Sequence, residues 1–169
     1  MPDAAQVLIA AILIGTGATL VMDVWTIVRR RILGVPALDY ALVGRWLGWM
    51  MRGRLRHHPI AASPPVRGER VIGWIAHYVT GIVFAAILLA LWGLDWAREP
   101  TIGPALMVGI GSVAAPFLLM QPAMGAAIAA SHTPRPNQAR IHSLVTHAVF
   151  GLGLYVTGCA IAMVSGSIR

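Results

Sequence analysis

Residues 71–94 read VIGWIAHYVTGIVFAAILLALWGL and contain no Asp, Glu, Lys or Arg. A helix that crosses a bilayer needs about 20 mainly apolar residues. Three further windows, at about 5–28, 101–131 and 141–165, also meet this requirement. The whole chain of 169 residues is 57% hydrophobic and 11% charged. We therefore expect an all-α membrane protein with four transmembrane helices, forming a single domain over residues 1–169.

The 13 basic residues are all arginine, and most are predicted to lie on one side of the membrane. Nine fall from Arg29 to Arg70, and two more, Arg135 and Arg140, lie between the third and fourth helices. The positive-inside rule then places both arginine-rich loops in the cytoplasm and both termini outside it. Because the positive charge lies in membrane loops, we expect contact with the bilayer and its anionic lipid headgroups and not with nucleic acid.

The long first cytoplasmic loop is expected to contain a short helix at about 37–51. Apolar residues recur there every four positions, and Asp39 lies near the start, as a helix cap does. The apolar positions are Leu38, Leu42, Trp46 and Met50. We interpret this segment as a helix lying in the cytoplasmic interface. The basic cluster that follows is interpreted as a solvated, lipid-facing run: Arg52, Arg54, Arg56, His57 and His58.

The second and fourth helices share a spacing pattern that indicates an internal repeat. Residues 73–81 read GWIAHYVTG and residues 143–151 read SLVTHAVFG, so that a small residue, a histidine and a glycine recur at intervals of four. The first and third helices match more loosely. These patterns predict two tandem helical hairpins that run in the same direction through the membrane.

One polar side chain lies toward the arginine-rich end of each apolar stretch. These residues are Asp23, His77, Gln121 and His147. At 1.5 Å per residue, the three ionisable groups lie about 9–11 Å from the cytoplasmic boundary. Thr19, Thr80 and Tyr155 share helix faces with them by spacings of three and four. Since ionisable groups in hydrocarbon mark functional sites by default, we predict one polar pocket open to the cytoplasm.

Several chemistries fit this set of side chains. His77, His147 and Asp23 have the donor atoms for a transition metal, and the two histidines alone for a haem iron. A proton, an ion or a small ligand is an alternative occupant, and simple helix packing is another. The sequence has no CxxC or HExxH spacing, no phosphate-binding glycine loop and no nucleophile elbow. It therefore gives no positive support for an enzyme or for a particular cofactor.

Several longer strings resemble a family of bacterial membrane proteins called domain of unknown function 2938. They are GATLVMDVW at 17–25, LDYALVGRWLG at 38–48, PPVRGER at 64–70, MQPAMG at 120–125 and SHTPRPN at 131–137. The resemblance implies a small multi-pass protein of the bacterial inner membrane and carries over no catalytic residue. We expect a ligand-binding or proton-binding protein, with a structural subunit of a larger membrane complex as the alternative. A transport role for so few helices also predicts a homo-oligomer.

Overall fold

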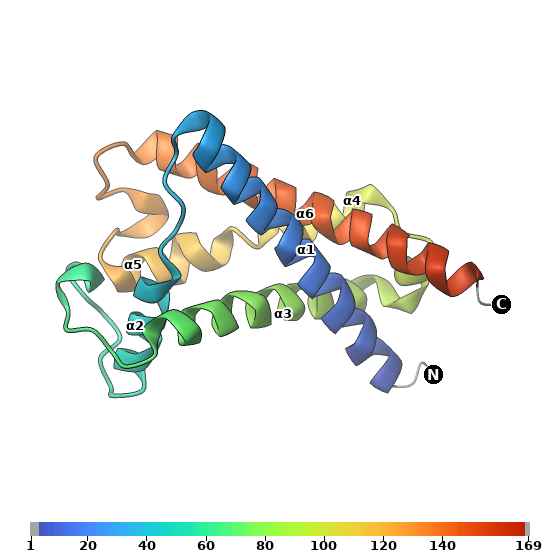
Figure 1. Cartoon of the computed structure of the whole chain (residues 1–169), viewed down its shortest axis with the longest axis horizontal. Coiled ribbons are helices and arrows are strands. Elements are labelled where there is room, and N and C mark those ends of the chain that lie inside the picture. Colours follow the sequence, from blue (N-terminus) through green and yellow to red (C-terminus); the bar gives the residue numbers. More distant parts are fainter. Residues whose placement is uncertain (1–3, 168–169) are drawn as a thin grey trace. The chain divides into compact units, whose positions relative to one another are not determined.

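The computed structural model describes residues 4–167 and the side chains of residues 4–164 (Figure 1). This part of the chain contains helices and loops and no strand, as predicted. The helices are α1 (Ala4–Leu33), α2 (Tyr40–Met50), η1 (Ile60–Ala62), α3 (Glu69–Arg98), α4 (Ile102–Gly111), η2 (Pro116–Met120), α5 (Gln121–Met124), η3 (Ile128–Ala130) and α6 (Pro136–Ser167).

Four helical segments are long and apolar enough to cross a membrane. They are Ala4–Leu33, Glu69–Arg98, Ile102–Met124 and Pro136–Val164. Four spans and one additional short helix agree with the predicted fold class. The chain is a multi-pass membrane protein.

The fold divides into two compact units, which are described separately. Unit 1 comprises residues 1–35, 78–112 and 145–169, and unit 2 comprises residues 36–77 and 113–144. Helices α3 and α6 are each divided between the units, with one part in unit 1 and the other in unit 2. The organisation as a single domain stays a prediction.

Unit 1 is held together where helix backbones approach each other at small residues. A Cβ atom added to Gly15 of α1 would lie 2.5 Å from the Cα atom of Ile82 in α3. One added to Gly153 of α6 would lie 2.9 Å from the Cα atom of Ala18 in α1. Such distances require glycine, and close backbone contact is the usual source of helix association in membranes. The largest fully buried apolar side chains, Ile14, Leu88 and Leu154, pack around these contacts.

The order of these contacts gives the helix directions within unit 1. Along α1, Gly15 approaches Ile82 and Asp23 bonds to Tyr78, so α1 and α3 run antiparallel. Helices α1 and α6 are also antiparallel, and in Figure 1 α1 begins at the end of unit 1 where α6 finishes.

In unit 2, α2 is capped as the sequence predicted. The Asp39 side chain accepts a hydrogen bond from the Ala41 amide at 2.9 Å. The helix then crosses the start of α3 with glycine on both sides: a Cβ atom on Gly44 would collide with the Glu69 carbonyl, and one on Gly73 with the Tyr40 carbonyl. Helix α2 therefore packs a glycine face on the start of α3.

The third span is interrupted at its prolines and is shorter than the helix expected over 101–131. Helix α4 ends at Gly111, a π-helical turn occupies Pro116–Met120, and α5 ends at Met124. Pro116 and Pro122 have no N–H group to donate, and the Pro116 ring crowds the carbonyl one turn earlier, so regular bonding fails there. Gly125, with φ 99°, then ends the helix in a left-handed cap. The span therefore ends about two turns before the predicted residue.

Candidate functional site

His147 of α6 is held by a short hydrogen bond to the end of α4. Its Nδ1 atom lies 2.6 Å from Oγ of Ser112, a residue that is only 2% exposed. The Ser112 hydroxyl donates to the carbonyl of Gly109, also at 2.6 Å. The two helices meet so closely here because Gly109 faces Gly151 across the interface.

This pair of bonds determines which nitrogen of His147 carries the proton. A serine hydroxyl has one hydrogen and two acceptor lone pairs. Since Ser112 donates its hydrogen to Gly109, it accepts from His147, and Nδ1 is the protonated nitrogen. In the neutral imidazole, Nε2 then presents a lone pair. No hydrogen bond of Nε2 is found within the described residues.

Asp23 and Thr19 lie on the face of α1 that meets α3. The Tyr78 hydroxyl donates to Oδ2 of Asp23 at 3.0 Å. Thr19 is buried, donates to the Gly15 carbonyl at 2.7 Å and lies against Gly81. The carboxylate of Asp23 therefore has a donor from the adjacent helix, as a charged group at membrane depth requires.

Tyr155 and Thr80, the two flanking residues predicted on other helices, differ in their surroundings. Tyr155 packs against the buried apolar cluster of unit 1, whereas Thr80 lies on an exposed part of α3. Of the residues predicted to form the pocket, five belong to unit 1: Thr19, Asp23, Thr80, His147 and Tyr155.

His77 belongs to unit 2, where it joins an aromatic cluster. Its Nε2 atom lies 3.1 Å from the Tyr40 hydroxyl, and the two rings stack with centroids 4.3 Å apart. Trp74 meets the His77 ring edge-on, at 5.7 Å between centroids. This histidine therefore helps to hold the start of α2 on α3.

Gln121 also belongs to unit 2, at the first residue of α5. The π-helical turn before it lets the backbone N–H of Gln121 donate to the Pro116 carbonyl. Its side-chain oxygen Oε1 is enclosed and has no hydrogen-bond partner in the described part of the chain. An enclosed acceptor without a donor is uncommon in folded proteins.

Each of the four predicted polar residues thus has different neighbours. Two of them lie in unit 1 and two in unit 2. The convergence of Asp23, His77, Gln121 and His147 on one pocket stays a prediction. Within residues 4–167, no group of three His, Cys, Asp or Glu side chains is arranged to hold a metal ion. Joint ligation of a haem or metal by His77 and His147 stays a hypothesis.

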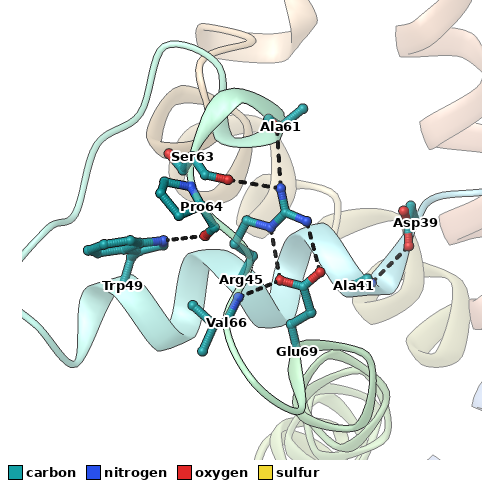
Figure 2. Close-up of polar contacts among 9 residues, drawn as sticks. All are labelled: Asp39, Ala41, Arg45, Trp49, Ala61, Ser63, Pro64, Val66 and Glu69. Carbon is teal, nitrogen blue, oxygen red and sulfur yellow. Dashed lines mark hydrogen bonds and ion pairs between the residues drawn. The ribbon is translucent and has the colours of Figure 1, made fainter.

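The most extensive polar cluster of unit 2 links α2 to the start of α3 through Arg45 (Figure 2). Its guanidinium binds both carboxylate oxygens of Glu69, at 2.8 and 2.9 Å, and donates to the carbonyls of Ala61 and Ser63. Glu69 also accepts from the Val66 amide at 2.9 Å. Hydrogen bonding to Glu69 raises the pKa of Arg45, so this pair stays ionised. The cluster fixes the loop before α3.

The prediction of a solvated basic cluster at 52–58 was wrong for His57. This side chain is fully buried, with Nδ1 2.8 Å from the Ser63 hydroxyl, and its backbone amide donates to the Ala123 carbonyl. His58 and the three arginines of the cluster are exposed. A neutral imidazole can donate through one nitrogen and accept through the other, and it avoids burying the permanent charge that the neighbouring arginines carry.

Comparison with known proteins places the chain by sequence. Residues 12–161 match the profile of a family described as "Protein of unknown function (DUF2938)". The chain belongs to the DUF2938 family. No curated protein and no solved structure matches it. The resemblance noted from short sequence strings is therefore confirmed over most of the chain, and the site of this DUF2938 protein must be interpreted from its own residues.

Three side chains of this DUF2938 protein were missed by sequence reasoning, although each contacts a predicted residue. They are Ser112, Tyr78 and Tyr40, which contact His147, Asp23 and His77. Ser112 follows a glycine pair in an apolar stretch, and a hydroxyl in such a stretch could have marked it as a candidate site residue. Tyr40 carries no such signal, because tyrosines at helix ends are ordinary interfacial anchors. Tyr78 lies within a span beside His77, and its spacing did not point to Asp23.

Proposed function

We propose that this DUF2938 protein binds and releases protons inside the membrane, with His147 as the acceptor. The observation that carries the proposal is the Ser112 bond, which leaves the Nε2 lone pair of His147 without a partner in the described chain. When Nε2 takes up a proton, Nδ1–H still donates to Ser112. Protonation therefore needs no rearrangement of helices α4 and α6, which suits repeated exchange.

Asp23 supplies a second acceptor in the same unit. Its carboxylate accepts a hydrogen bond from the Tyr78 hydroxyl, which holds it in place. A carboxylate and an imidazole are the side chains that proton-carrying membrane proteins use within the bilayer. In this proposal Asp23 and His147 carry the proton, and Thr19, Ser112 and Tyr78 position them.

We further propose an inner-membrane location with both termini outside the cytoplasm. The arginine distribution supports this orientation, because eleven of the 13 arginines lie in, or at the helix ends next to, the two loops between spans one and two and between spans three and four. An even number of spans is consistent with it. The exposed arginines of the first loop would contact anionic lipid headgroups.

The proposal includes the tandem repeat of two hairpins. Helix α1 meets α3 at Gly15 and Gly81, and α4 meets α6 at Gly109 and Gly151. In each contact a hydroxyl residue shortly after the first glycine donates back to that glycine's carbonyl: Thr19 to Gly15 and Ser112 to Gly109. The same local arrangement in two hairpins supports a common origin.

Proton uptake into protein-containing liposomes tests the function. With a pH-sensitive dye inside and an imposed membrane potential, we expect wild-type protein to acidify the lumen faster than protein-free liposomes do. His147→Gln keeps a polar side chain of similar size but cannot titrate, so the rate should fall about tenfold or more. His132→Gln is the matched control, because His132 is exposed in a loop.

Wild-type uptake no faster than in protein-free liposomes would contradict the proposal. Equal rates in the His147 and His132 variants would contradict the role of His147. Constitutive copurification with one larger complex, together with absent uptake, favours the structural-subunit alternative.

A further inference from the structure

Arg29 is a buried cation near the end of α1. It is 8% exposed, whereas the neighbouring Arg30 and Arg31 lie on the surface. One nitrogen, Nη1, donates to the Thr146 hydroxyl at 3.2 Å. The Nε–H group is enclosed and has no acceptor, and no carboxylate pairs with this guanidinium in the described part of the chain. A buried charge normally has a counter-charge. Arg29 departs from this rule within the described part of the chain.

A second enclosed donor lies one helical turn earlier. The indole Nε1–H of Trp25 is buried and has no hydrogen-bond partner among the described residues. Residues four apart share a face of a helix, so Trp25 and Arg29 are neighbours on α1. Thr146, one residue before His147, holds the guanidinium from α6. All three residues belong to unit 1.

From these unfilled groups we propose that Trp25, Arg29 and Thr146 form a binding site for a phosphate group. The missing partner is anionic, because it faces an uncompensated guanidinium. It has several acceptor oxygens, because the N–H groups of Trp25 and Arg29 both lack an acceptor. A phosphate satisfies both requirements, and arginine binds phosphate oxygens through paired N–H groups. Thr146 orients the guanidinium toward it.

The phosphate group has two sources, a phospholipid headgroup and free inorganic phosphate. Arg29 lies at the arginine-rich end of α1, where headgroups are expected, and this depth suits the first source. The chemistry of the site is the same for both. The site is separate from the proposed proton acceptor, since neither Asp23 nor Nε2 of His147 takes part in it.

Binding measurements on delipidated full-length protein test the site. Native mass spectrometry measures binding of phosphatidylglycerol, with monogalactosyl diacylglycerol as a lipid that lacks phosphate. Titration calorimetry measures inorganic phosphate. The Arg29→Gln variant is compared with Arg30→Gln, which removes one positive charge from an exposed neighbour. We expect Arg29→Gln to weaken phosphate-group binding about tenfold or more and Arg30→Gln to leave it within about twofold.

The Trp25→Phe variant provides a second test that does not depend on the charge. It removes one N–H group from an aromatic side chain and should weaken binding about threefold. Selective loss of phosphatidylglycerol in these variants identifies a lipid site, and selective loss of inorganic phosphate identifies a solute site.

The proposal fails if the wild type binds neither probe, or if the Arg29 and Arg30 variants bind both probes alike. If Arg29→Gln does not fold, unchanged binding in Trp25→Phe overturns the site.

Discussion

Alanine at position 109 is expected to destabilise the protein by about 2–3 kcal/mol, whereas alanine at position 111 of the same helix leaves the stability unchanged or slightly higher. A Cβ atom on Gly109 would lie 2.5 Å from the Gly151 backbone nitrogen and 2.9 Å from the His147 carbonyl. These atoms belong to a helix backbone, which cannot move aside as a flexible side chain can. Helices α4 and α6 would have to separate.

Gly111 is a close control because it lies two residues away in α4. A Cβ atom there meets nothing within 4 Å. Thermal unfolding in detergent, followed by circular dichroism, compares Gly109→Ala with Gly111→Ala. If both variants unfold at the wild-type temperature, the close contact between α4 and α6 is refuted.

Arg45→Ala is expected to cost about 2–3 kcal/mol and to release the loop before α3. The substitution removes four hydrogen bonds and leaves the Glu69 carboxylate, 17% exposed, with the Val66 amide as its remaining donor in the cluster. Hydrogen exchange measures the effect locally, and residues 60–69 should exchange faster than in the wild type. Glu69→Ala should give the same pattern.

The ion pair of Arg98 with Asp95 is the matched control. Its side chains are 62% and 89% exposed, and exposed pairs contribute about 0.5 kcal/mol or less. We therefore expect Arg98→Ala to leave both the exchange pattern and the stability near those of the wild type. Equal effects of the two substitutions would show that Arg45 is not a structural centre of unit 2.

The spans were predictable from sequence because apolar length has one dominant physical meaning, the thickness of the bilayer. The cap at Asp39 was predictable for a similar reason, since short acidic side chains bond helix amides locally. The end of the third span was not, because Gly125 and two prolines compete with a continuous apolar pattern. A hydropathy pattern carries no information on which backbone hydrogen bonds can form.

The candidate site was only partly predictable. The spacing of Asp23 and His147 marked them as polar groups at membrane depth, but spacing does not reveal partners on other helices. Ser112 and Tyr78 were found only through the contacts of α4 with α6 and of α1 with α3. The buried state of His57 depends on a loop fold that no periodic pattern encodes.

The tautomer of His147 tests the central claim most directly. In protein labelled with ¹⁵N at histidine, the His147 signals are assigned by their loss in His147→Gln, and correlation of ring protons with ring nitrogens identifies the protonated nitrogen. In the neutral form we predict the proton on Nδ1, with a mixture of tautomers in Ser112→Ala. A neutral His147 that carries its proton on Nε2 would contradict the proposal. The Nε2 lone pair, which is proposed to accept the exchanged proton, would then be occupied.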